Sequence, residues 1–151
     1  MGLRVIRAAV IVAMGSGLGL AWNSLSGLGF ALGRNVLIQD GDVLVDVAAA
    51  KARLDKGALF LDARPRDFYD MAHIPGSLSL PEEDFDKAFA RLEPRLRSSL
   101  DVVVYCAGFG CEASHVVARK LKQKGIPADV LHEGWPAWQD AHYPERSGSE
   151  P

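Results

Sequence analysis

The sequence has few cysteines and no excess of either charge. Two cysteines in 151 residues are too few for the multiple disulfide bonds of small secreted scaffolds. The 17 basic and 19 acidic residues give a net charge of −2, so nothing favours binding to nucleic acid. The composition, 48% apolar and 24% charged, excludes a disordered or fibrous chain, and the length excludes a multidomain enzyme.

Ionisable side chains are also absent from residues 8–33, which are mainly Ala, Val, Ile, Leu and Gly. Arg4 and Arg7 precede this segment, and every acidic residue follows it. A bilayer needs about 20 apolar residues, and residues 5–25 are long enough to span one. We therefore predict that residues 1–33 form an N-terminal transmembrane helix that anchors the chain.

Two alternatives to the anchor remain open. A buried core helix of 26 uncharged residues is hard to fit into so small a domain. A cleavable signal peptide has small residues, Gly19 and Ala21, at a cleavage site, but the apolar character continues to Leu32. The two Arg place the N-terminus in the cytoplasm. We therefore expect a single-pass protein of a bacterial inner membrane with its C-terminal domain in the periplasm, or a secreted protein if the segment is cleaved.

After Arg34, short β-rich segments alternate with helical ones. We expect a linker at 34–42, a folded domain at 43–144 and a disordered tail at 145–151. The predicted strands are 43–45, 58–62, 77–80, 101–105 and 128–131. The predicted helices run from the Asp46 cap to 56, from the turn at 64–65 to 72, from 81–83 to just before Pro94, from 112 or 113 to 125, and from 135 to 141. This alternation predicts an open, mainly parallel α/β sheet with helices on both faces.

Cys106 directly follows the most apolar predicted strand, 101–105, which fits the centre of a parallel sheet. Such sheets bind ligands at the carboxyl ends of their strands, so the position suggests a functional cysteine. After it, Gly108 and Gly110 fit a ring of inward-pointing amides, or an ordinary turn. The following helix adds its positive end, which favours a thiolate or persulfide. The alternative is that Cys106 is only a small buried hydrophobic side chain.

Three stretches in this order and spacing resemble the rhodanese-like sulfurtransferases over residues 43–144. They are Phe-Leu-Asp-Ala-Arg at 60–64 with His-Ile-Pro-Gly-Ser at 73–77, Val-Val-Tyr-Cys at 103–106, and Gly-Trp-Pro-Ala-Trp at 134–138. The resemblance implies a rhodanese fold in which Cys106 is the sulfur-carrying nucleophile, with no cofactor. The implied active loop continues through Ala107, Gly108, Phe109, Gly110, Cys111, Glu112, Ala113 and Ser114. With the N-terminal segment, the chain is similar to the membrane-tethered, extracytoplasmic rhodaneses of bacteria.

The loop departs from the family pattern. The common rhodanese loop has an Arg five positions after its Cys, and related phosphatases have an Arg six positions after it. Cys111 and Glu112 stand there in this sequence, and Ser114 takes the place of the usual Ser, so the loop is about two residues longer. Without a guanidinium for a bidentate oxyanion contact, thiosulfate recognition is in question and phosphatase activity is not expected.

Cys111 gives the loop a second thiol. A chain that folds back can bring the two Cα atoms within the roughly 4.4 to 6.8 Å that a disulfide requires. In an oxidising compartment, Cys111 can then resolve a persulfide or sulfenate on Cys106. The alternative, equally open, is that Cys111 only packs beneath the loop.

The remaining polar candidates are Asp62, Arg64 and the histidines. Asp62 and Arg64 can form an ordinary exposed ion pair. The resemblance implies instead that Asp62 accepts hydrogen bonds near the active loop and that Arg64 supplies positive charge there. His73 is predicted to fix a turn through a ring nitrogen. No metal site is expected, because His73, His115, His132 and His142 lack ligand spacing. Trp135 and Trp138 are predicted to cover the sheet.

Two functions from different classes therefore remain. One is a sulfurtransferase that takes sulfane sulfur from a small sulfur-containing donor onto Cys106 and passes it to a thiol or cyanide. The other is a non-catalytic or thiol-redox module that uses Cys106 and Cys111 to sense oxidants or bind a partner.

The uncharged segment generates the first prediction. The full-length protein should fractionate with membranes, and its C-terminal domain should be accessible from outside the cytoplasm. Release of the intact protein by alkaline extraction would contradict the anchor. A mature chain that begins near Trp22 would instead identify a signal peptide.

Overall fold

The computed structural model describes residues 37–39 and 42–149, which belong to one compact unit spanning Asn35–Pro151. The predicted membrane anchor at 1–33 lies outside the described residues. In the part of the chain that is described, no helix has the length and hydropathy needed to cross a bilayer.

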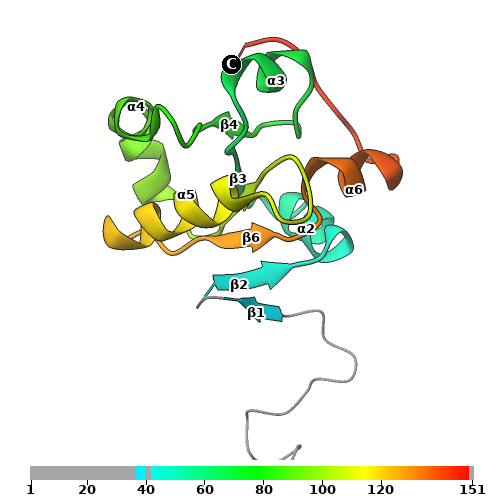
Figure 1. The fold of residues 1–151 in the computed structure, drawn as a ribbon, viewed down its shortest axis with the longest axis horizontal. Helices are drawn as coiled ribbons and strands as arrows, with labels where there is room; N and C mark the ends of the chain where they lie inside the picture. The colour runs from blue at the N-terminus through cyan, green and yellow to red at the C-terminus, as the bar shows by residue number, and fades with distance from the viewer. Residues whose placement is uncertain (1–36, 40–41, 150–151) are drawn as a thin grey trace, which may run out of the picture. The chain divides into compact units, whose positions relative to one another are not determined.

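The described strands form one sheet in the order β1-β2-β6-β5-β3-β4 (Figure 1). The β1–β2 pair is antiparallel and the other pairs are parallel, which confirms the predicted α/β sheet. β5 lies inside the sheet between β6 and β3, as its apolar sequence predicts. The strands are β1 (Leu37–Gln39), β2 (Asp42–Val45), β3 (Leu59–Asp62), β4 (Leu78–Ser79), β5 (Val102–Tyr105) and β6 (Asp129–Leu131).

Helices cover both faces of the sheet, as predicted. Successive side chains of β5 belong to two separate buried clusters, as the alternation of a strand requires. One cluster includes side chains of α4 and α5, and the other includes side chains of α2 and α6. Trp135 and Trp138 of α6 pack in the second cluster, which confirms that they cover the sheet. The helices are α2 (Val47–Leu54), α3 (Arg66–Met71), α4 (Phe85–Ser98), α5 (Glu112–Gln123) and α6 (Gly134–Asp140).

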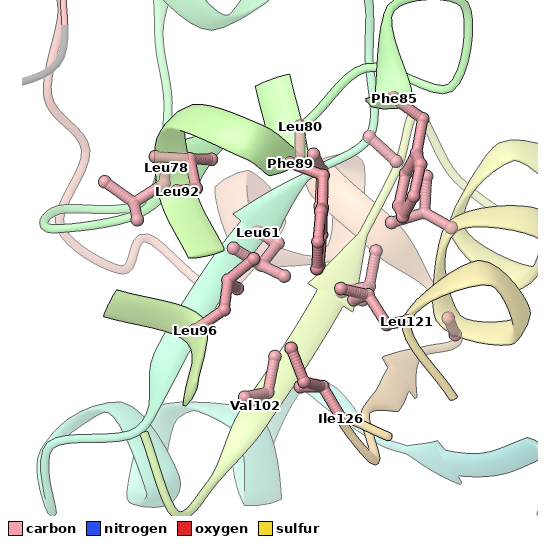
Figure 2. Close-up of a cluster of buried hydrophobic side chains, with 14 of the residues drawn as sticks. Leu61, Leu78, Leu80, Phe85, Phe89, Leu92, Leu96, Val102, Leu121 and Ile126 are labelled. Atoms are coloured by element: carbon pink, nitrogen blue, oxygen red, sulfur yellow. The ribbon is translucent and has the colours of Figure 1, made fainter. Parts of the chain in front are cut away.

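Helix α4 continues through Pro94, so the expected end before this residue is wrong. Proline inside a helix costs about 3 kcal/mol, because it removes one hydrogen bond and crowds the preceding turn. Leu96, beyond the proline, is fully buried with Phe89 and Leu92 (Figure 2). Burial of a Leu side chain contributes about 1.5 to 3 kcal/mol, which offsets much of that cost. The buried face of the helix therefore decides its length.

The expected linker at 34–42 is also corrected. Residues 37–39 form β1, and Asp42 is the first residue of β2. The Asp42 side chain is only 6% exposed and bonds to the Nδ1 atom of His115 on α5 at 2.8 Å. A polar segment with Asp and Gly reads as a linker in the sequence, but this pairing across 73 positions buries its carboxylate.

The expected disordered tail at 145–151 is corrected for residues 145–149. The backbone of Arg146 exchanges two hydrogen bonds with His73, at 2.7 and 2.9 Å. The Gly148 amide donates to the Asp70 carbonyl at 2.8 Å. This segment, red in Figure 1, therefore runs beside α3. Its polar composition suggested disorder, but backbone hydrogen bonds hold it without apolar side chains.

Candidate active site

Cys106 lies immediately after the last residue of β5, at the carboxyl edge of the parallel strands. Only 4% of the residue is exposed, because it packs in the cluster beneath α4 and α5. The predicted position is therefore confirmed. Cys106 is both a mostly buried side chain and the first residue of the loop at the edge where such sheets bind ligands.

The two cysteines are joined by a disulfide bond, with their Cα atoms 6.2 Å apart. Cys111 is also the residue before the first turn of α5, and it is partly buried against the same cluster as Cys106. The disulfide therefore rules out the alternative that Cys111 only packs beneath the loop, although it also packs there. Its role as a resolving thiol stays a prediction.

The loop between the cysteines depends on its two glycines. Gly108 has φ 145° and Gly110 has φ 72°, as the sequence predicts for residues whose backbone other side chains resist. The Cys111 amide donates to the Gly108 carbonyl at 3.1 Å, so this amide is used within the loop. Phe109 is 72% exposed and its ring meets His132 edge-on, with the centroids 4.9 Å apart.

Gly134, the first residue of α6, is a site residue that sequence reasoning missed. A Cβ atom there would lie 2.5 Å from the Cys106 carbonyl oxygen and 2.7 Å from the Gly108 nitrogen. The next residue, Trp135, donates its amide to the Cys106 carbonyl at 2.8 Å. Only glycine allows α6 to begin this close to the cysteine loop. The Gly-Trp pair at 134–135 can be seen in the sequence, but the sequence does not show that this pair contacts the loop at Cys106.

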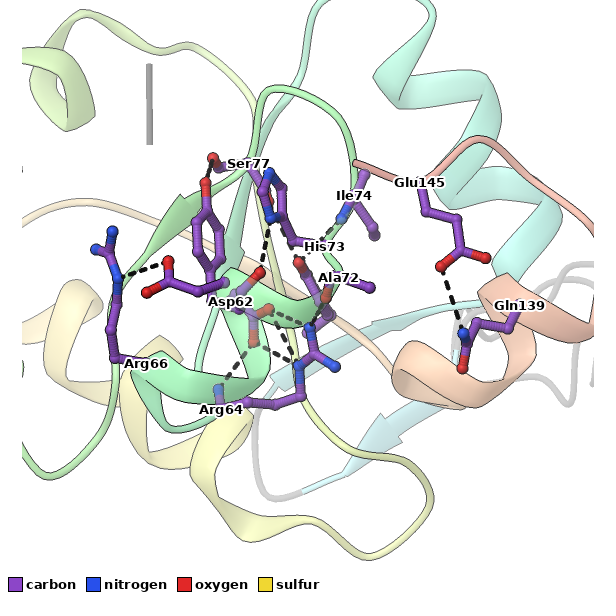
Figure 3. A network of polar contacts seen from close by, with 12 residues as sticks. Asp62, Arg64, Arg66, Ala72, His73, Ile74, Ser77, Gln139 and Glu145 are labelled. Carbon is purple, nitrogen blue, oxygen red and sulfur yellow. Dashed lines mark hydrogen bonds and ion pairs between the residues drawn. The ribbon is translucent and has the colours of Figure 1, made fainter. Parts of the chain in front are cut away.

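Asp62 and Arg64 form a buried ion pair at the carboxyl end of β3 (Figure 3). The guanidinium donates through Nε and one terminal nitrogen to both carboxylate oxygens, at 2.6 to 3.1 Å. The same terminal nitrogen donates to the Ala72 carbonyl at 2.7 Å. Their side chains are 0% and 5% exposed, so the pair is not the ordinary exposed ion pair that the sequence left open.

The Arg64 guanidinium also stacks on Trp135, 4.6 Å from the ring centroid. Burial alone would lower the pKa of Arg64, but the hydrogen bonds and charge of Asp62 raise it, so the guanidinium stays protonated. A buried pair of this kind carries almost no net charge, which limits the positive field that Arg64 offers to an anion.

Tyr105 holds the turn that follows α3. Its hydroxyl accepts a hydrogen bond from the Ile74 amide at 3.2 Å and lies 3.2 Å from the Ser77 hydroxyl. Burial, and then the nearby Asp62 charge, raise the pKa of Tyr105 well above its ordinary value. The phenol is therefore a neutral structural group. His73, with Nδ1 2.8 Å from the Tyr69 carbonyl, has the predicted structural role.

A pocket of about 480 Å³ opens over the cysteines. Cys106, Cys111, Arg64 and Phe68 contribute to its wall. The rest of the lining comes from Ala63, Pro65, Glu83, Ala107, Ala113 and Trp135. A larger apolar than polar surface faces the space, and its volume lies within the range of small-molecule sites.

The start of α5 carries the other predicted loop residues. Ala113 lines the pocket, whereas the Glu112 side chain is 82% exposed and lies 3.9 Å from Arg119. The Ser114 hydroxyl donates to the Cys111 carbonyl at 3.3 Å, which fixes the first turn. Among residues 37–39 and 42–149, no three His, Cys, Asp or Glu side chains gather where a metal ion could bind.

The fold and this cysteine loop agree with a comparison against protein families. The model of the rhodanese-like domain matches residues 46–141, which extends from the cap of α2 to the end of α6. The chain therefore belongs to the rhodanese-like family.

Relatives of known sequence or structure share this domain. The HTH-type transcriptional regulator Rv0324 of Mycobacterium tuberculosis is 25% identical over 115 residues, 76% of this chain and 49% of that protein. The chain thus spans about half of this curated relative. The Alr3790 protein of Anabaena sp. is 30% identical with a TM-score of 0.58, covering 69% of this chain and 80% of that one. Thiosulfate sulfurtransferase of Pseudomonas aeruginosa is 26% identical with a TM-score of 0.56, and the match covers 71% of this chain and 20% of that one.

The contact at Gly134 generates the second prediction. Gly134→Ala should displace the cysteine loop, because the new Cβ would clash with backbone at Cys106 and Gly108. Gly125→Ala is the matched control, since Gly125 also has a positive φ, +79°, but has no atom within 4 Å of a new Cβ. We expect Gly125→Ala to lose about 1 kcal/mol of unfolding free energy from backbone strain, and Gly134→Ala to lose more because of the added clash.

Only Gly134→Ala should also slow the reaction of Cys106 with a thiol-specific reagent in the reduced protein. Denaturant titration and alkylation followed by mass spectrometry measure the two effects. Equal alkylation rates in the two variants would show that α6 does not shape the loop.

Proposed function

We propose that this protein is a sulfurtransferase that carries sulfane sulfur as a persulfide on Cys106 and passes it to a thiol or cyanide. The observation that carries the proposal is the placement of Cys106, at the start of a strand-to-helix loop and in the wall of an open pocket. Membership of the rhodanese-like family supports it, as does the similarity to the thiosulfate sulfurtransferase of Pseudomonas aeruginosa.

The reaction divides into two balanced steps. In the first, the Cys106 thiolate attacks the outer sulfur of a donor, the donor's S–S bond breaks, and sulfite or a thiolate leaves with the electron pair. In the second, an acceptor thiolate or cyanide attacks the outer sulfur of the persulfide, and the electron pair returns to Cys106. The positive end of α5, a helix of 12 residues, favours the charged sulfur in both steps.

The disulfide requires a preceding step. A thiol reductant must deliver two electrons to the Cys106–Cys111 bond before the Cys106 thiolate can attack a donor. The oxidised form is therefore a resting state, and the dithiol is the form that accepts sulfur.

The disulfide also favours a second candidate function, a thiol-redox module. The Cys111 thiolate can attack the inner sulfur of a Cys106 persulfide, form the disulfide and expel hydrosulfide. A sulfenic acid on Cys106 can be resolved in the same way, with hydroxide as the leaving group. In this function the cysteine pair reports on oxidants or on a partner, and the similarity to a transcriptional regulator agrees with such a role.

Location is a separate proposal. The uncharged segment at 8–33, which follows Arg4 and Arg7, supports a membrane-tethered protein whose rhodanese-like domain works outside the cytoplasm. An oxidising compartment of that kind would favour the disulfide form.

The two cysteines generate the third prediction. With an excess of sulfane donor, reduced wild-type protein should gain one sulfur atom on Cys106, measured by intact and peptide mass spectrometry. Cys106→Ser should abolish both this gain and turnover, because no nucleophile remains. Cys111→Ser should retain both and should stop the release of hydrosulfide that follows disulfide formation.

Ser99→Ala is the folding control, because it removes a hydroxyl that donates to the Arg95 carbonyl at the end of α4, outside the cysteine loop. Equal loss of turnover in both cysteine variants, with intact folding, would identify an obligate dithiol and favour the redox function.

The position of Glu112 generates the fourth prediction. Glu112→Arg should lower the Michaelis constant for thiosulfate several-fold and make it more dependent on salt, because a repulsive charge becomes an attractive one. Glu93→Arg, the same charge change on the exposed face of α4, is the control.

Steady-state rates at several ionic strengths measure the effect. A wild-type Michaelis constant for thiosulfate near 1 μM, the low end for enzymes, would show that another residue already supplies the charge.

A further inference from the structure

The pocket over Cys106 is larger and more apolar than an inorganic sulfur donor requires. About 480 Å³ is space for an organic molecule of moderate size, whereas thiosulfate has only five heavy atoms. Ala63, Phe68 and Trp135 supply apolar wall around the cysteine. The shape therefore suits a molecule that has an apolar body as well as a sulfur atom.

The charges of the pocket do not select an anion. Arg64 is the one cation among the described residues of its lining, and its charge is already neutralised by Asp62. Glu83 adds a negative charge to the same lining. A small oxyanion or a carboxylate would thus enter a site with no uncompensated positive side chain, which disfavours it.

Phe68 is an apolar side chain that lines the pocket and also reaches solvent. It belongs to α3 and is 53% exposed. Met71, three residues further along α3 and 71% exposed, lies on the same side of this helix. An apolar ligand in the pocket would therefore cover part of the exposed Phe68 ring.

From the volume, the neutralised charge and the exposed Phe68 ring, we infer that the sulfur acceptor of Cys106 is a small organic thiol with an apolar body that packs against Phe68 and with no charged group besides the reacting thiolate. The inference rests on the proposed sulfurtransferase function and names its substrate class. The acceptor thiolate attacks the outer sulfur of the Cys106 persulfide and leaves as an organic persulfide. The S–S bond to Cys106 breaks, the electron pair stays on Cys106, and no oxidant or reductant is consumed.

The test uses the full-length protein with Cys111→Ser, reduced and then loaded with inorganic polysulfide, so that Cys111 cannot expel the added sulfur. Mass spectrometry first verifies one added sulfur on Cys106. The loss of that sulfur is then timed with phenylmethanethiol, ethanethiol and 3-mercaptopropionate at equal thiolate concentrations. We expect the phenyl compound to react on the order of tenfold faster than ethanethiol, from the apolar area it buries. The carboxylate compound should react more slowly than ethanethiol.

Phe68→Ala should reduce the ratio of the phenylmethanethiol rate to the ethanethiol rate several-fold, and Phe68→Leu should retain most of it. Leu100→Ala is the matched control, because Leu100 is a fully exposed apolar residue before β5, at the opposite end of that strand from Cys106. Both rates come from one protein sample, so partial unfolding of a variant cancels in the ratio.

Equal rates for the three thiols, or a faster rate for 3-mercaptopropionate, would overturn the inference and leave the sulfurtransferase function intact. An unchanged ratio in Phe68→Ala would also overturn it. Failure of Cys106 to gain sulfur is visible before any acceptor is added, and it would contradict the proposed function and the inference together.

Discussion

The hydrogen bond from the Trp135 amide to the Cys106 carbonyl is the contact on which the site depends. It joins the end of β5 to the first turn of α6 across the side-chain-free face of Gly134. The cysteine loop is thereby closed against α6, and the indole ring is brought beneath the guanidinium of Arg64. One backbone contact therefore places Cys106, the loop and one wall of the pocket.

The buried ion pair of Asp62 and Arg64 determines how little net positive charge the site offers. Its two charges cancel at short range, so the pair orients the turn at Ala72 and the Trp135 ring without attracting anions strongly. Buried ion pairs contribute more to a unique arrangement than to stability. In the proposed function, the stabilisation of a charged sulfur would consequently be left to the positive end of α5.

The sequence predicted what depends on local pattern. These features include the central strand and the place of Cys106 directly after it. They also include the Asp46 cap, whose carboxylate accepts a hydrogen bond from the Ala49 amide at 2.7 Å. The sequence-based prediction was wrong where contacts with residues far along the chain determine the structure. Pro94 stays within a helix because the face beyond it is buried, and Asp42 belongs to a strand because His115 meets it from α5. Whether Asp62 and Arg64 are exposed could not be decided either, since two residues at a strand end show no sign of what covers them.

The segment beside α3 has a consequence for the order in which the site is made. Phe68 belongs to a helix that is held at its far end by hydrogen bonds from Arg146 and Gly148. Those residues are synthesised after every other part of the pocket. A chain that ends before Arg146 would therefore contain the cysteine loop and α6 but would lack the hydrogen bonds that hold the far end of α3.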